Sequence, residues 1–134
     1  MEDFVTYEQA EKLADLGFDY KCIACYDEEE FEYNGEPNDY NSGYYRYNLI
    51  SAPTLTQAQK WLREVKDIHI EIKYTINPQY EPWIGKVVII EDYPEPNTII
   101  DTDTCDTYEE ALSEAIDKAL ELLTQQSNGN QDEI

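Results

Sequence analysis

The feature that most restricts the fold of this chain is a five-residue pattern that occurs three times. Each copy reads Thr, an apolar residue, any residue, Gln or Glu, and Ala, and the copies lie at 6–10, 54–58 and 107–111. In such a capping box the Thr hydroxyl accepts a hydrogen bond from a backbone N–H of the first helical turn, and the Gln or Glu side chain accepts one from the Thr N–H. Each copy therefore predicts the start of a helix.

Apolar residues recur at helical spacing after each of these starts. They predict helices over about 7–16, 55–66 and 108–125. The first helix is expected to stop at Gly17, because glycine readily adopts the left-handed conformation that closes many helices. We interpret the apolar stripes of these helices as core rather than as binding grooves.

Between the helices, apolar and polar residues alternate as they do in half-buried strands. The alternation is strongest over 68–76, which we expect to pair with 84–92 as an antiparallel hairpin. Weaker patterns predict strands over 19–27, 44–49 and 98–101. The order α-β-β-α-β-β-(β)-α predicts an α+β fold, in which a mostly antiparallel sheet of about four strands carries a single layer of three helices on one face.

The length of 134 residues is typical of one domain, and we expect a single α+β domain over 1–126. Residues 28–43 form an acidic, Tyr-containing insertion, and we expect 127–134 to form a flexible tail. The first residues contain neither a basic nor an apolar segment, so we expect no signal peptide, and no apolar run is long enough to cross a bilayer. Three cysteines, an odd number, do not indicate a disulfide framework, so we expect a cytoplasmic protein.

The net charge limits the choice of partner. Nine Lys and Arg against thirty Asp and Glu give a formal net charge of −21 at pH 7. Nucleic acids and anionic membranes are bound through Lys and Arg side chains that neutralise phosphates, so we expect neither as a direct partner. A basic protein or a cationic ligand matches this charge.

The cysteines and the one histidine are candidate metal ligands. Cys22 and Cys25 form a CxxC pair, and Cys105 and His69 complete the residue types of a zinc site. Zinc-binding pairs of this spacing usually lie on a turn, whereas these two fall in an expected strand, where side chains three positions apart point to opposite faces. We therefore interpret the cysteines as small buried residues and expect no metal and no cofactor. His69 has no nucleophile partner at motif spacing, so we expect no catalytic residues and no enzymatic activity.

Acidic residues and tyrosines are interleaved in and directly after the insertion. Tyrosine adds contact area at low entropic cost, so this combination favours a recognition surface. The alternative is a solvated face that keeps the protein in solution. Trp61 lies at the margin of the apolar face of its helix, where it either caps the core or anchors a partner. The candidate binding residues are Glu28, Glu29, Glu30, Glu32, Tyr33, Tyr40, Tyr44, Tyr45, Tyr47 and Trp61.

Several blocks of the chain resemble a known family. Residues 7–10 with 16–19, the segment SAPTLTQAQKWLR at 51–63, and 108–111 are similar to a family of small uncharacterised proteins from phages and prophages of gut Bacteroidales. The resemblance covers most of the chain, and the 51–63 block is its most specific part. It implies a setting in the cytoplasm of an infected host cell, and it implies neither an activity nor functional residues.

These observations together predict a non-enzymatic accessory protein that acts by binding. The leading hypothesis is that its acidic faces occlude a basic host protein, such as a defence factor or a nucleic-acid-binding protein. One alternative is a protein that sequesters a small molecule in a Tyr-lined cleft. Another is a structural or virion-associated component that forms a homo-oligomer.

We expect salt to stabilise the fold. The net charge of −21 opposes compaction, and added ions screen the repulsion between exposed carboxylates. The melting temperature in about 0.5 M NaCl should therefore exceed the value in about 0.05 M NaCl. Thermal unfolding followed by circular dichroism measures this, with KCl as the control for an ion-specific effect. A melting temperature that salt leaves unchanged or lowers would contradict the expectation.

Overall fold

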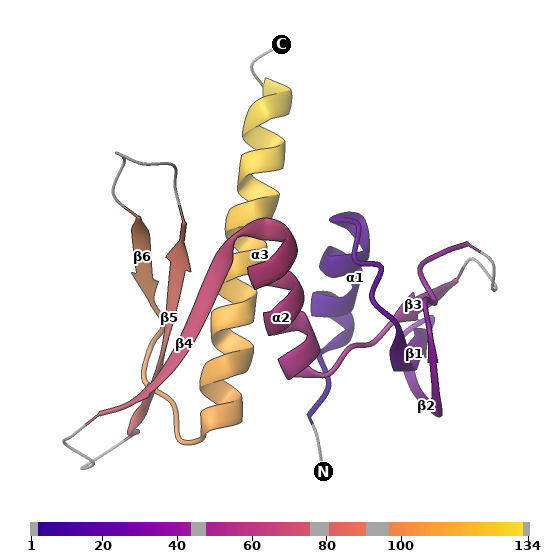
Figure 1. Ribbon diagram of the computed structural model, residues 1–134, viewed down its shortest axis with the longest axis horizontal. Coiled ribbons are helices and arrows are strands. Elements are labelled where there is room, and N and C mark those ends of the chain that lie inside the picture. Colours follow the sequence, from indigo (N-terminus) through magenta and orange to yellow (C-terminus); the bar gives the residue numbers. More distant parts are fainter. Residues whose placement is uncertain (1–2, 44–47, 76–80, 91–96, 133–134) are drawn as a thin grey trace. The chain divides into compact units, whose positions relative to one another are not determined.

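A computed structural model of the protein describes residues 3–43, 48–75, 81–90 and 97–132, with 126–132 described by their backbone (Figure 1). Within these ranges it contains three helices and two three-stranded antiparallel sheets, so the chain is α+β, as the sequence predicts. The single sheet of about four strands is wrong, because two separate sheets of three strands take its place. The chain forms two compact units, Met1–Trp61 and Leu62–Ile134.

In the first unit, helix α1 (Tyr7–Asp15) begins at the predicted capping box. The Thr6 Oγ1 atom accepts from the Gln9 N–H at 3.1 Å, and Gln9 Oε1 accepts from the Thr6 N–H at 2.9 Å. Gly17 follows the helix with a φ of 95°, in the left-handed region. Both ends of this helix are therefore determined by local residues that the sequence analysis identified.

The sheet of the first unit has the order β2-β1-β3, with antiparallel pairing on both sides of the central strand. Its strands are β1 (Cys22–Asp27), β2 (Glu30–Asn38) and β3 (Leu49–Ser51). The central strand β1 is mostly buried, whereas β2 is exposed at every position but its last. The expected strand at 44–49 starts in residues outside the described ranges, and the described strand there begins at Leu49.

Strand β2 occupies most of the acidic insertion at 28–43, for which the sequence predicts no strand. The sequence pattern does not predict this strand, because β2 has no buried face and contains Gly35 and Pro37. Both residues are uncommon inside strands. Pairing with β1 through a tight turn defines the strand instead. The extra strand also changes the predicted element order to α1-β1-β2-β3-α2-β4-β5-β6-α3.

Helix α2 (Leu55–Lys66) begins at the second capping box. The Thr54 Oγ1 atom accepts from the Gln57 N–H, and Gln57 Oε1 accepts from the Thr54 N–H, both at 3.1 Å. Asp67 follows the helix with a φ of 57°, a conformation more usual for glycine or asparagine. Its carbonyl accepts from the Ile90 N–H at 3.1 Å, so this residue connects the end of the helix to the residue that follows the strand Trp83–Ile89.

In the second unit, β4 (Ile68–Tyr74), β5 (Trp83–Ile89) and β6 (Thr98–Asp101) form a sheet in the order of the chain. The predicted β4–β5 hairpin is confirmed. Helix α3 (Tyr108–Asp132) contacts β4 and β5 and extends past residue 125, where the sequence predicted its end (Figure 1). No helix in the described ranges is both long and apolar enough to cross a membrane.

Strand β5 approaches α3 closely at Gly85. A Cβ atom at this position would lie 3.0 Å from the carbonyl oxygen of Ala111, 3.0 Å from the Cβ of Ala115 and 3.2 Å from the Cγ2 of Thr102. All three distances are shorter than ordinary van der Waals contact. The sheet and the helix therefore pack at this spacing because residue 85 has no side chain.

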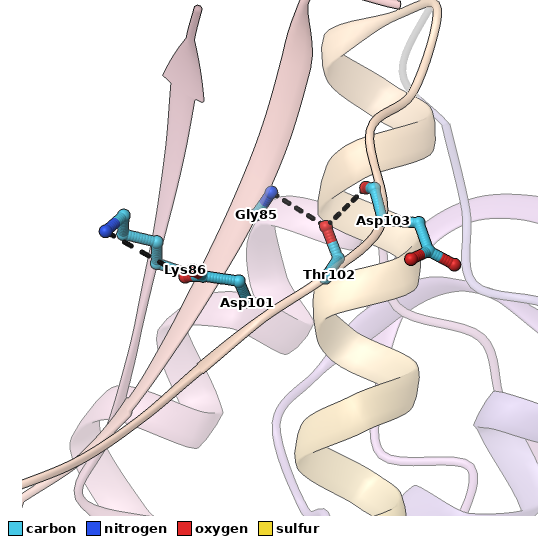
Figure 2. Close-up of polar contacts among 5 residues, drawn as sticks. All are labelled: Gly85, Lys86, Asp101, Thr102 and Asp103. Atoms are coloured by element: carbon cyan, nitrogen blue, oxygen red, sulfur yellow. Dashed lines mark hydrogen bonds and ion pairs between the residues drawn. The ribbon is translucent and has the colours of Figure 1, made fainter.

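Thr102 attaches the segment after β6 to the same point of β5 (Figure 2). Its hydroxyl accepts from the Gly85 N–H at 2.9 Å and donates to the Asp103 carbonyl at 2.8 Å, while its own N–H donates to the Gly85 carbonyl at 2.8 Å. The Thr102 side chain is buried, and its hydroxyl is satisfied both as an acceptor and as a donor. The Lys86 Nζ and Asp101 Oδ1 atoms are 3.8 Å apart, and Figure 2 also draws this ion pair. Both side chains are more exposed than that of Thr102, so the pair contributes little to stability.

Replacing the Thr102 hydroxyl should destabilise the fold. The Thr102→Val variant keeps the shape but leaves the buried Gly85 N–H without its acceptor, which should lower the free energy of unfolding by about 1–3 kcal/mol. Thr102→Ser is the matched control, because it keeps the hydroxyl and loses a methyl group worth about 0.8 kcal/mol. Urea denaturation measures both variants. A valine variant as stable as the parent, or a serine variant at least as damaging as valine, would refute the role of this hydroxyl.

Candidate functional site

The tip of the β1–β2 hairpin is a run of four acidic residues. Glu28 and Glu29 form the two-residue turn, and Asp27 pairs directly with Glu30 across it. Like charges that face each other across an antiparallel pair are destabilising. Glu28 also has a φ of 59°, in the left-handed region where glycine and asparagine are preferred. The residues of this tip are therefore not those that would best stabilise a hairpin.

A surface hollow of about 570 Å³ lies at this tip, lined by Asp27, Glu28, Glu29, Glu30 and Asn48. The Asn48 Nδ2 atom donates to Asp27 Oδ1 at 2.6 Å, which holds the residue before β3 against the end of β1. In the part of the chain that the structure describes, no three His, Cys, Asp or Glu residues are close enough to hold a metal ion. The lining of the hollow is polar and acidic, which suits a cationic group.

Strand β2 separates its acidic and aromatic side chains onto two faces. The Phe31 ring lies 5.0 Å from Phe4 and 5.6 Å from Tyr26, and the Tyr33 ring lies 6.5 Å from Phe4, all between centroids. Phe31 and Tyr33 are nevertheless 44% and 65% exposed. Because side chains alternate along a strand, Glu30 and Glu32 lie on the opposite face.

The structure places the predicted residues Glu28, Glu29, Glu30, Glu32 and Tyr33 together on this hairpin. Two aromatic partners at this hairpin, Phe4 and Phe31, are not among the predicted residues. The alternation of Glu with aromatic residues over 30–33 was a usable indication for Phe31. Nothing in the sequence indicated Phe4, because its contact with β2 is made only in the folded chain.

Two other predicted residues lie in the core, which corrects their assignment to a binding surface. Tyr40 is 4% exposed, and its hydroxyl accepts from the Asn34 Nδ2 at 2.9 Å. Trp61 is 1% exposed, with its ring centroid 5.5 Å from that of Phe18. Both aromatic rings fill the interior of the first unit, so neither is available to a partner. The remaining candidates, Tyr44, Tyr45 and Tyr47, lie outside the described residues.

The cysteines lie in the core, in the strand setting that the sequence predicts for the CxxC pair. Cys22 and Cys25 are buried on β1, and Cys105 is buried before α3. Burial raises the pKa of Cys22 to about 12. Burial also raises the pKa of Cys105 to about 12, with a further contribution from the nearby Glu114. Both thiols are therefore protonated at neutral pH and are poor nucleophiles.

His69 lies on β4. Its Nε2 atom is 3.8 Å from Glu71 Oε1, and both side chains are substantially exposed. An exposed pair of this kind is worth little in stability. This histidine is thus a partly exposed strand residue on the polar side of β4.

Comparison of the chain with protein-family models, with curated protein sequences and with solved structures gives no match. The resemblance to a phage family therefore stays a prediction. The segment 51–63, its most specific block, contains the end of β3, the second capping box and the first turns of α2.

The buried thiols should be slow to react in the folded protein. Because the thiolate is the reactive form and its fraction falls tenfold for each unit of pKa, Cys22 and Cys105 should react with Ellman's reagent about a thousandfold more slowly than free cysteine. The same protein unfolded in urea is the control, and there all three cysteines should react quickly. Rapid labelling of either residue in the native protein would contradict this assignment.

Proposed function

We propose that this protein is a non-enzymatic accessory protein of phage type that acts in the host cytoplasm by binding and occluding a basic host protein. The binding surface is the β1–β2 hairpin, with the carboxylates of Glu28, Glu29, Glu30 and Glu32 and the ring of Tyr33. One observation supports this most strongly. The nine residues of β2 are exposed along almost the whole strand, and acidic and aromatic side chains alternate on its first half.

The exposed rings favour a binding role over a solubility role. A face that serves only to keep the protein in solution needs charge and gains nothing from apolar area. Phe31 and Tyr33 nevertheless expose much of their ring surface beside the acidic tip. Aromatic area bordered by polar residues is typical of interfaces, where a partner covers the rings and the charges remain at the rim.

The sign of the charge specifies the partner. Four adjacent carboxylates at the hairpin tip attract a basic surface and repel an acidic one. The net charge of −21 adds a long-range attraction that speeds the encounter with a basic protein. A basic host factor, such as a defence protein or a nucleic-acid-binding protein, fits these requirements.

The two other hypotheses receive less support. The described residues that line the hollow at the hairpin tip are acidic residues and an asparagine, which favours a basic protein over a small molecule held between tyrosines. The small-molecule hypothesis retains Tyr44, Tyr45 and Tyr47 as its candidate residues. A structural or virion-associated component would form a stable homo-oligomer in light scattering.

Charge reversal at the hairpin tip should abolish partner capture. Tagged protein is incubated with a lysate of a Bacteroidales host, and captured proteins are identified by mass spectrometry. The triple variant Glu28→Lys, Glu29→Lys, Glu30→Lys should lose basic proteins that the parent retains, and with the purified partner its association should be slower and less dependent on salt. Its stability should change by about 0.5 kcal/mol or less, because these residues are exposed.

The matched control is the triple variant Glu11→Lys, Glu71→Lys, Glu121→Lys, which changes the net charge equally at exposed positions elsewhere. It should capture the same proteins as the parent. Equal capture by all three proteins would refute the hairpin as the binding surface and leave the acidic face as a solubility device. Loss of binding only on replacing Tyr44, Tyr45 or Tyr47 would favour the small-molecule hypothesis.

A further inference from the structure

We infer that β2 binds its partner by strand addition, pairing its free edge with an extended segment in which basic and apolar residues alternate. This inference rests on the proposed function, because it takes the β1–β2 hairpin as the binding surface. It specifies how the partner pairs with β2 and which residue pattern the bound segment has.

The edge of β2 is open to a further strand. In the order β2-β1-β3 this strand lies at the end of the sheet, and within the described ranges β1 is the one strand that pairs with it. Every second residue of an edge strand turns its N–H and C=O away from its neighbour, which leaves a template for another chain. Peptides use such edges in the recognition mode called β-augmentation.

The usable part of this edge is the first half of the strand. Residues 30–33 pair with β1 in continuous register, whereas the register shifts between Cys22 and Ala24 on the partner strand. Gly35 and Pro37 lie in the second half of β2, and proline has no N–H to donate. The pairing site is therefore the segment Glu-Phe-Glu-Tyr at 30–33.

The two faces of this segment select the sequence of the added strand. An added strand alternates its side chains as β2 does, so one set lies beside Glu30 and Glu32 and the other beside Phe31 and Tyr33. Opposite charges, and apolar side chains beside aromatic rings, are both favourable neighbours across strands. Phe4, packed against both rings, widens the apolar side of the site. The fitting segment alternates Lys or Arg with apolar residues.

The same carboxylates exclude a second copy of this chain. Pairing β2 with β2 would bring Glu side chains of the two copies together, and like charges across strands are destabilising. Two chains that each carry a net charge of −21 also repel each other. The occupant of this edge is therefore a basic segment of another protein.

A peptide of repeating Lys-Val tests this inference on the full-length protein by fluorescence anisotropy. The control peptide has the same composition with all Lys before all Val, so that its charge is equal and its alternation is lost. The alternating peptide should bind more than about tenfold tighter than the control. Two further peptides are N-methylated, one on all Lys amides and the other on all Val amides, so that each has one of its two edges blocked. At least one of them should bind more than about tenfold more weakly than the unmethylated alternating peptide.

Variants of the protein test the pairing of charges. Glu30→Lys with Glu32→Lys should reverse the preference, so that a repeating Glu-Val peptide binds and the Lys-Val peptide does not. Glu36→Lys is the matched control, because it lies on the same strand beyond Gly35 and should leave the preference unchanged.

The outcomes separate this inference from the proposed function. Equal binding of the alternating and block peptides, or full binding by both N-methylated forms, would overturn strand addition. No peptide binding, while partner capture still depends on Glu28, Glu29 and Glu30, would also overturn strand addition alone. If capture no longer depends on those residues, the proposed function fails as well.

Discussion

The packing of the second unit depends on the close contact between Gly85 of β5 and helix α3. At Gly85 the sheet comes so close to α3 that even a methyl group would overlap with Ala111 and Ala115. The small residues on the helix and the glycine on the strand form one contact, and Thr102 completes it by bonding to both the N–H and the C=O of Gly85. This contact attaches the residue after β6 to β5, while β6 itself is held by its antiparallel pairing with β5. A larger residue at position 85 would have to move a backbone segment rather than a flexible side chain.

The elements that the sequence predicted well depend on short-range interactions. The pair Thr6 and Gln9 and the pair Thr54 and Gln57 each form their capping bonds within four residues, so the pattern alone identifies the helix start. The sequence predicts the β4–β5 hairpin equally well, because the residues of β4 alternate between apolar and polar. In both cases the information lies within the element itself.

The elements that the sequence did not predict depend on residues far away in the chain. Strand β2 forms by pairing with β1 and buries little of its own, so no apolar pattern marks it. The burial of Tyr40 and Trp61 depends on Asn34 and Phe18, and no local pattern distinguishes a tyrosine in the core from one on the surface. The acidic part of the candidate site was predicted because charge is read directly from composition. Its division into a carboxylate face and an aromatic face required the strand.

The two tryptophans of the chain fall one in each unit, Trp61 in the first and Trp83 in the second. Trp61 is enclosed in the core, whereas Trp83 is the first residue of β5 and contacts the rings of Tyr74 and Tyr108. An indole shielded from water emits at a shorter wavelength than one in contact with it, so each unit carries its own optical reporter. Removing one indole at a time would make the emission of the protein follow a single unit, and would show whether the two units lose their structure together.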